Sequence, residues 1–308
     1  MDELKCTNSD RQLQLDCMKL KTIDEIYAAI DTFPRLTKEF GGFMFTPSMD
    51  NDFFPDTIQN MIKKAKVKPG IIGFSDKESL DILVNSEQLK ERFPMPAEYN
   101  EYNLITALKQ LAFNDKIEGT THGKVYEFYN DPQFVLNFPV THEISLYYLD
   151  LLTKITSDIL INMPLLNEIE LKRATGWPIY LFNMEYANDN LQPNSYPIKG
   201  PSHSTFLLYL LQNKLATNED DKYLVNTFLN SFSQFVKTDS PSTKDQMWPK
   251  IDSNRPSIHV AIKRSLNEIK NSLLSTRHNF WKNELKFDGH ITIPYKAITI
   301  SESTHTEL

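Results

Sequence analysis

The stretch "VKPGIIGFSDKES" (residues 67–79) decides the fold class, because a short apolar run in it passes directly into a polar turn. The run is bounded by turn residues, which predicts a buried strand over 67–74. A helix is expected just before it, over 55–65, with Pro55 and Asp56 at its start and lysines at its end. This alternation of helix and strand is typical of α/β proteins.

Two more short runs rich in β-branched and aromatic residues predict strands, "WPIYLFNMEY" (177–186) and "SIHVAI" (257–262). Residues 79–175 are mostly helical in pattern. We therefore expect two parallel strands and a hairpin partner surrounded by many helices. Such a set cannot form a stable α/β sheet covered on both faces, so the predicted fold is helix-rich α/β with an incomplete central sheet.

Helix boundaries are indicated by capping residues. Thr22 and Glu25 have the spacing of a capping box at the start of a helix. Thr217 and Asp220 have the same type of spacing, so Thr217 is expected to cap a second helix. A closing helix is expected over 277–285.

The composition excludes several classes of partner. The chain has 308 residues, of which 40% are hydrophobic and 24% are charged, and its net charge is −7. Its lysines and arginines are scattered, so no nucleic-acid partner is expected. No apolar run approaches the ~20 residues that a membrane-spanning helix needs. The first residues show no basic start and no apolar stretch of a signal peptide.

The two cysteines and the C-terminal tail favour an oxidising compartment. Cys6 and Cys17 lie in a polar stretch without further ligands at metal spacing, which favours a small disulfide loop over half of a zinc site. Two unrelated free thiols are the alternative. The tail, 301–308, ends in "HTEL", a close variant of the tetrapeptides that retain proteins in the endoplasmic reticulum (ER). We expect the ER lumen as the location, although four such letters can also occur by chance.

One histidine is a candidate for catalysis. In "IKGPSHSTFLLYLL" (198–211), His203 lies in a turn before an apolar segment, where an imidazole can act as a general base or be merely solvated. His122 and His142 have no partners at metal spacing and are interpreted as surface or helix-start residues. Neither a metal nor another cofactor is expected.

A resemblance to a known family begins at "FTPSMDNDFFPDT" (45–57). Pro47, Asp50 and the residues 53–56 are similar to the "PVxDGDFFPD" segment of type-B carboxylesterases, the family of cholinesterases, liver carboxylesterases and neuroligins. Further matches follow in the family's order: "IIGFSDKES" with "xxGxxxxEG", "SDILINMP" with "GDxxFxxP", "GWPIYLFNMEY" with "GxPxYxYxFxY", "GPSHSTFLLYLL" with "GxxHxxELxYxF", "FVKTDSP" with "FAKTGNP", and "WPKID" with "WPxYx". Four aromatic residues fall on core positions of the family: Phe232, Phe235, Trp248 and Trp281.

The resemblance implies an α/β-hydrolase that cleaves small carboxylic esters with a Ser-His-Glu triad. Carried over residue by residue, His203 is the general base, Glu78 is the acid, and Cys6 pairs with Cys17. Residues 1–308 correspond to the C-terminal half of the family domain. The other half would carry the oxyanion loop and the "GxSxG" nucleophile, which this sequence does not contain: "GFSDK" has Lys77 at the second glycine position.

Two departures from the family pattern affect the surroundings of the pair. Ser79 and Leu80 follow Glu78 where a glycine is usual, and Phe206 replaces an acidic residue after the histidine. The chain alone is expected to be inactive. The alternatives are a non-catalytic, cholinesterase-like interaction module and a truncated gene product.

Overall fold

The computed structural model describes residues 3–31, 51–85, 99–111, 121–137, 141–211 and 218–286. The chain divides into two units, Met1–Pro47 and Ser48–Leu308. Pro47, Asp50, Thr217 and the 301–308 tail, which the sequence singled out, lie outside the described residues.

The first unit contains two short helices, α1 (Arg11–Lys19) and α2 (Ile23–Asp31). A disulfide joins Cys6 to Cys17 on α1, with 5.6 Å between their Cα atoms, so the predicted pairing is confirmed. The capping box before α2 is confirmed as well. The Thr22 N–H donates to the Glu25 carboxylate at 2.8 Å, and the Glu25 N–H donates to Thr22 Oγ1 at 3.2 Å.

Helix α3 (Ile58–Lys64) opens the described part of the second unit, and it begins later than the sequence suggested. Its N-cap is Thr57, whose hydroxyl accepts the Asn60 N–H, so Pro55 and Asp56 precede the helix. The Asp56 carboxylate instead pairs with the Lys64 ammonium at 2.6 Å. That hydrogen bond is the main reason why the pKa of Asp56 is lowered to about 2.

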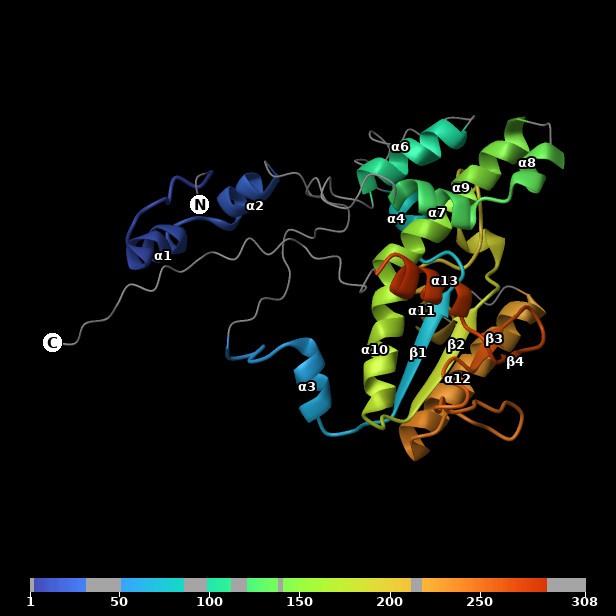
Figure 1. The fold of residues 1–308 in the computed structure, drawn as a ribbon. Coiled ribbons are helices and arrows are strands. Elements are labelled where there is room, and N and C mark those ends of the chain that lie inside the picture. The colour runs from blue at the N-terminus through green and yellow to red at the C-terminus, as the bar shows by residue number, and fades with distance from the viewer. Residues whose placement is uncertain are drawn as a thin grey trace. The chain divides into compact units, whose positions relative to one another are not determined.

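A four-stranded sheet lies at the centre of the second unit, in the order β1 (Gly70–Ser75), β2 (Ile179–Met184), β3 (His259–Ile262) and β4 (Glu268–Lys270) (Figure 1). The first three strands are parallel, and β4 is antiparallel to β3. All three predicted strands are present. The expectation of two parallel strands and a hairpin partner is corrected in one respect: the three predicted strands are all parallel, and the hairpin partner is β4, which was not predicted.

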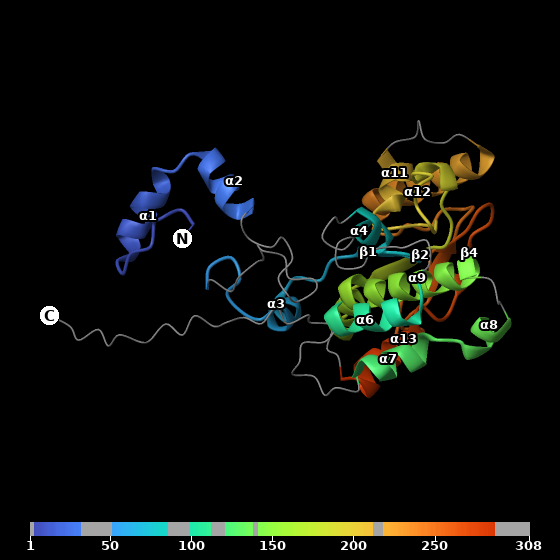
Figure 2. The same cartoon turned by 90° about the horizontal axis from the view of Figure 1, so that it is seen from above.

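Helices cover both faces of this sheet and thereby bury its parallel strands, so the expectation that a sheet of so few strands could not be covered on both faces is wrong (Figure 2). Helices α11 and α12 lie on one face, and α9 and α6 lie on the other. The bounds of the helices in the second unit after β1 are α4 (Leu80–Asn85), α6 (Glu101–Leu111), α7 (Thr121–Tyr129), α8 (Pro132–Asn137), α9 (Thr141–Ser157), the π-helical turn η1 (Asp158–Asn162), α10 (Met163–Ala174), the 3₁₀ turn η2 (Asp189–Leu191), α11 (Thr205–Leu211), α12 (Glu219–Thr238), α13 (Ser275–Asn279) and the π-helical turn η4 (Phe280–Glu284).

Helix α12 starts at a different cap from the one predicted. Its N-cap is Asn218, whose side-chain oxygen accepts the Asp221 N–H at 2.8 Å, so the assignment of the cap to Thr217 is wrong by one residue. Asparagine caps a helix at least as well as threonine, and its amide oxygen reaches the same orphan donors. The predicted closing helix at 277–285 corresponds to the end of α13 followed by η4.

An aromatic core fills the space between the sheet and α12. The ring of Phe182 on β2 contacts Phe228, Phe232 and Trp248 edge to face, with ring centroids 5.6–6.5 Å apart. Trp248 and Trp281 are fully buried, and Phe232 and Phe235 are partly buried, which confirms their assignment to the core. Edge-to-face aromatic pairs stabilise such a core beyond the area they bury.

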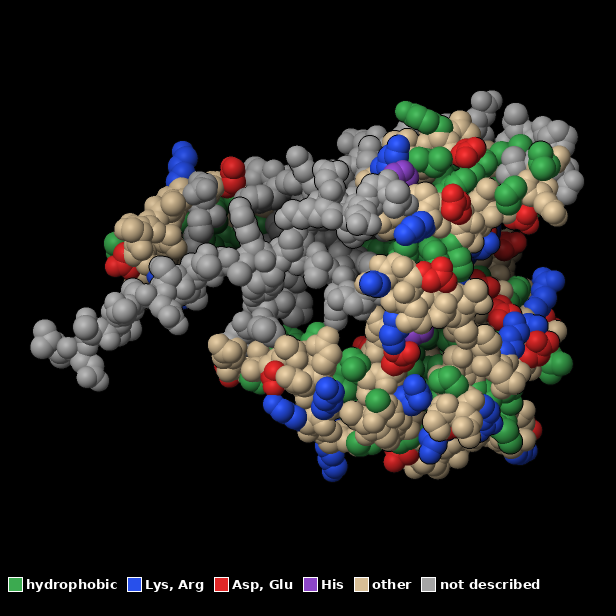
Figure 3. All heavy atoms as spheres, in the orientation of Figure 1, with side chains coloured by type: hydrophobic (Ala, Val, Ile, Leu, Met, Phe, Trp, Pro, Cys, Tyr) green, Lys and Arg blue, Asp and Glu red, His purple; other side chains and the backbone are tan. Residues whose placement is uncertain are grey.

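The surface mixes both signs of charge. On the face shown in Figure 3, basic and acidic side chains are interspersed and form no single basic patch. No helix in the described part of the chain is both long and apolar enough to cross a membrane.

Candidate active site

The candidate site begins where β1 ends. Ser75 is the last residue of β1, a turn follows, and α4 begins at Leu80, which leaves Glu78 on the turn at the carboxyl end of a parallel strand. The Glu78 side chain is only 4% exposed. One carboxylate oxygen, Oε1, accepts the N–H of Ser75 at 2.7 Å. A buried carboxylate needs such partners, since burial without them is costly.

The second oxygen of this carboxylate contacts the histidine that the sequence predicted. Glu78 Oε2 lies 2.8 Å from His203 Nδ1, although 125 residues separate the two positions. The carboxylate accepts from Nδ1–H, and this fixes the tautomer in which Nε2 carries the free lone pair. The His203 side chain is 57% exposed. The structure therefore brings the two predicted site residues together in a geometry suited to an acid-oriented general base.

Backbone contacts hold the two loops side by side. The Lys77 N–H donates to the Pro201 carbonyl at 3.0 Å, and the His203 N–H donates to the Glu78 carbonyl at 3.2 Å. Gly200 has φ +148°, a conformation that L side chains rarely adopt, and a Cβ there would lie 3.0 Å from the Lys77 side chain. A glycine is thus required for the close approach of the histidine loop to the glutamate turn.

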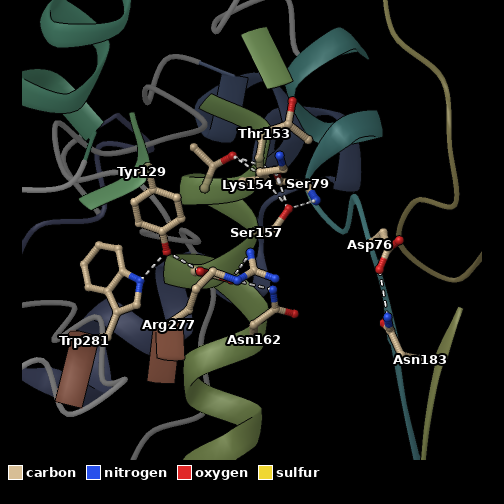
Figure 4. Close-up of polar contacts among 12 residues, drawn as sticks. Asp76, Ser79, Tyr129, Thr153, Lys154, Ser157, Asn162, Asn183, Arg277 and Trp281 are labelled. Atoms are coloured by element: carbon tan, nitrogen blue, oxygen red, sulfur yellow. Dashed lines mark hydrogen bonds and ion pairs between the residues drawn. The ribbon is translucent and has the colours of Figure 1, made fainter. Parts of the chain in front are cut away.

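Ser79 anchors the glutamate turn to α9, as Figure 4 shows. Its hydroxyl donates to the Thr153 carbonyl at 2.9 Å, and its N–H donates to Ser157 Oγ at 3.0 Å. Ser79 is fully buried, so these bonds are shielded from water. The departure from glycine at this position therefore adds a polar anchor and leaves Glu78 in contact with the histidine.

The electrostatics favour the charged form of the histidine. The hydrogen bond that the His203 ring donates to Glu78 is the main cause that raises the pKa of His203 above its usual value of 6.5, and partial burial opposes it. The Asp81 carboxylate adds a smaller effect in the same direction. General base catalysis requires the neutral imidazole, and the raised pKa makes that neutral form a stronger proton acceptor.

The second departure, Phe206, belongs to the core. The Phe206 ring lies on α11 and contacts Phe182 edge to face, with centroids 5.5 Å apart, and it also contacts Phe228. The acidic residue that the family has there is thus replaced by an aromatic packing contact. The Glu78–His203 contact is formed with phenylalanine at this position.

The other histidines that the sequence singled out lie elsewhere. His142 is exposed on the first turn of α9, and His122 lies on the first turn of α7, as predicted for helix-start residues. Within the described residues, no group of His, Cys, Asp and Glu has an arrangement that could hold a metal ion.

Sequence reasoning missed two polar groups around the site. The first group is Ser79 with its partners on α9. The second group is Ser202 and Asp81, since Ser202 Oγ donates a hydrogen bond to the Asp81 carboxylate. Serines of this kind carry no periodic signal, because each is defined by a partner more than 70 residues away. The only available sequence signal was their position directly beside Glu78 and His203.

Comparisons with known proteins show which family this chain matches. The model of the carboxylesterase family matches residues 1–281. The chain is 24% identical to "Gut esterase 1" of Caenorhabditis briggsae over 307 residues, covering 95% of this chain and 54% of the relative. It is 25% identical to "Gut esterase 1" of Caenorhabditis elegans over 291 residues, covering 88% of this chain and 50% of the relative.

A third relative, "Esterase cest-33" of Caenorhabditis elegans, is 24% identical over 263 residues, covering 82% of this chain and 45% of the relative. The chain thus spans about half the length of the curated relatives it matches. Since the family match extends over most of the sequence, the chain belongs to the carboxylesterase family.

Proposed function

We propose that this chain supplies the acid and the base of a Ser-His-Glu triad that hydrolyses small carboxylic esters. The observation that carries the proposal is the Glu78–His203 pair: a buried carboxylate 2.8 Å from Nδ1 of a half-exposed imidazole. Family membership supports ester substrates. No metal or other cofactor takes part in the proposed chemistry.

In the proposed mechanism, His203 Nε2 removes the proton from a serine hydroxyl while the serine oxygen attacks the ester carbonyl. Glu78 stabilises the imidazolium that results and keeps the ring in the required orientation. When the tetrahedral intermediate collapses, the imidazolium gives its proton to the departing alcohol and an acyl-serine remains. Water then attacks the acyl group, with His203 again taking and returning the proton.

The serine in this scheme comes from polypeptide outside the printed sequence. The only partial match to the nucleophile motif, "GFSDK", contains Ser75, which is buried at the end of β1 and whose N–H holds the Glu78 carboxylate. Ser75 is therefore part of the glutamate turn. We expect the isolated 308-residue chain to show no esterase activity, because loss of the nucleophile in such triads costs on the order of 10⁶ in kcat.

The sheet supports the proposal that this unit is the C-terminal part of an α/β-hydrolase domain. Within the described residues, β1 is paired on one side only, with β2. The unpaired N–H and C=O groups along the edge of a strand can pair with a further strand. We propose that strands of an N-terminal half pair with the second edge of β1 in the complete domain.

A fusion enzyme tests this function. The N-terminal half of a related gut esterase is joined to residue 1 of this chain, and p-nitrophenyl butyrate hydrolysis is measured for the fusion and for each half alone. We expect turnover only in the fusion. His203→Ala should reduce kcat on the order of 10⁶-fold, and Glu78→Gln about 10⁴-fold.

Matched controls are His142→Ala and Glu143→Gln, two exposed residues on α9 that should leave the activity unchanged. A folded fusion whose turnover survives both Glu78→Gln and His203→Ala would refute the proposed triad. A folded fusion without any turnover would instead favour the alternative, a non-catalytic interaction module.

We also propose that the protein acts in the ER lumen. The Cys6–Cys17 disulfide supports an oxidising compartment, and the HTEL tail resembles an ER retention signal. In cells that express the chain behind a cleavable signal peptide, deletion of 305–308 should move the protein into the medium. Equal retention of the intact and shortened chains would contradict this location.

A further inference from the structure

A second side-chain bridge joins the two loops that carry the candidate pair. Ser202 Oγ donates a hydrogen bond to Asp81 Oδ2 across 121 positions of sequence. Ser202 precedes His203 directly, and Asp81 lies in the first turn of α4, three residues after Glu78. The two bridges therefore connect the same pair of loops at neighbouring positions.

Ser202 also forms hydrogen-bond contacts within its own loop. Ser202 is only 3% exposed, and its N–H donates to Thr205 Oγ1 at 2.9 Å at the start of α11. The hydroxyl of Ser202 also lies 3.2 Å from the same Thr205 oxygen. A serine with both its backbone and its side chain bonded cannot rotate without breaking contacts on both loops.

The histidine loop contains one non-glycine residue, Ser204, whose backbone conformation the surrounding structure must maintain. Gly200 and Ser204 flank the loop with positive φ angles, +148° and +62°. A non-glycine residue such as Ser204 adopts a positive φ only at a cost, and the surrounding structure must maintain it. The Ser202–Asp81 bridge lies between these two positions and is suited to that task.

We propose that Asp81, acting through Ser202, is a positioning residue for His203: their hydrogen bond holds the histidine loop where Nδ1 meets the Glu78 carboxylate. This inference rests on the proposed function, in which His203 is the general base. Asp81 also places a second negative charge near the ring. Within the described residues, the charged groups that act on the ring are Glu78 and Asp81, and the Lys77 ammonium on the glutamate turn is paired with Asp150.

Nuclear magnetic resonance of the histidine ring in the 308-residue chain tests the proposal without requiring catalysis. The titration midpoint of His203 and the solvent exchange rate of its Nδ1–H are measured in the wild type, in Ser202→Ala and in Asp81→Asn. In both variants we expect Nδ1–H exchange to become about tenfold faster. Loss of one hydrogen bond to a charged group should favour opening of the Glu78–His203 contact by about this factor. In Asp81→Asn the midpoint should also fall, because a negative charge that favours the imidazolium is removed.

Conservative variants and controls separate positioning from a general effect on folding. Ser202→Thr, which keeps the hydroxyl, should restore slow exchange. Ser233→Ala and Asp245→Asn, at exposed positions on and after α12, should change neither quantity. Wild-type exchange in both Ser202→Ala and Asp81→Asn would overturn the inference. Faster exchange in Ser202→Ala without recovery in Ser202→Thr would overturn it as well.

Glu78→Gln in the same experiment distinguishes a failure of the positioning inference from a failure of the proposed acid–base pair. If Glu78→Gln lowers the His203 midpoint while Ser202→Ala and Asp81→Asn leave the ring unchanged, only the positioning inference fails. If Glu78→Gln also leaves the midpoint unchanged, the acid–base pair of the proposed function fails. In the fusion enzyme, Ser202→Ala should reduce kcat on the order of tenfold with KM unchanged, as expected for a slightly misplaced base.

Discussion

A buried ion pair beside the sheet is expected to control the stability of the second unit. The Asp158 carboxylate, at the start of η1, is fully buried, and Arg277 Nη1 lies 3.1 Å from one of its oxygens. Asn162 Nδ2 donates to the same carboxylate at 2.7 Å, and the Tyr129 hydroxyl donates to its other oxygen. Of these three partners, only the arginine carries a charge.

Replacement of Arg277 by leucine would leave this charge buried with two neutral donors. Two unit charges 3.1 Å apart interact by about 5 kcal/mol at an effective dielectric constant of ~20. Measured losses on breaking such a pair are ~3–5 kcal/mol. We therefore expect Arg277→Leu to lower the free energy of unfolding by about 3–5 kcal/mol, as measured by urea unfolding followed by circular dichroism.

The pH dependence of this loss has a definite sign. Burial already raises the pKa of Asp158 above its usual value despite the arginine, and removal of the arginine should raise it further. A folded state that binds a proton more tightly than the unfolded state gains stability as pH falls. The loss in Arg277→Leu should therefore shrink on acidification, as the buried carboxyl becomes protonated.

The exposed pair between Arg255 and Asp252 provides the matched control. Arg255→Leu removes a guanidinium from a solvent-exposed carboxylate, so its cost should stay below ~1 kcal/mol. Equal losses in Arg277→Leu and Arg255→Leu would refute the reasoning, and so would a loss in Arg277→Leu that grows on acidification.

Three further outcomes are expected. Gly73→Ala should lower the free energy of unfolding by about 1–3 kcal/mol in urea unfolding, because the new Cβ would lie 2.0 Å from the Phe182 ring; unchanged stability would contradict the packing described. Replacement of both Cys6 and Cys17 by serine should lower the free energy of unfolding of the first unit by roughly 2–3 kcal/mol, because the unfolded chain is no longer constrained by the disulfide. Trypsin should then cleave faster before residue 31, and unaltered cleavage would count against this. The pKa of His203 is raised in the folded state, so its contribution to the free energy of unfolding should be complete below pH 6.5, the usual pKa, and should disappear as pH rises through the raised pKa. His203→Gln should therefore flatten this part of the curve of stability against pH. An unchanged curve would contradict the expectation.

Local sequence patterns determined much of the fold. The strands at 67–74, 177–186 and 257–262 were predictable because short apolar runs between turn residues have few alternatives to a buried strand. The capping box at Thr22 and Glu25 was predictable because its hydrogen bonds join residues three positions apart. Where two capping residues are adjacent, as at 217 and 218, the pattern does not choose between them.

The direction of β3 and the order of the strands were decided only by tertiary structure. The sequence of β3 is compatible with either direction, and its parallel pairing with β2 depends on the long helical connection through α11 and α12. The short β4 carries too few residues to show a pattern, and it exists because the edge of β3 offers it hydrogen bonds.

For the site, the sequence by itself determined which residues are candidates: the resemblance to the family singled out Glu78 and His203, and each has the chemistry of its role. Tertiary structure decided that they meet at 2.8 Å, that Ser79 ties the glutamate turn to α9, and that Ser202 and Asp81 form a second bridge. The physical reason is that hydrogen bonds between residues 70 to 125 positions apart depend on how packed loops lie in space, and no local pattern of side chains records that arrangement.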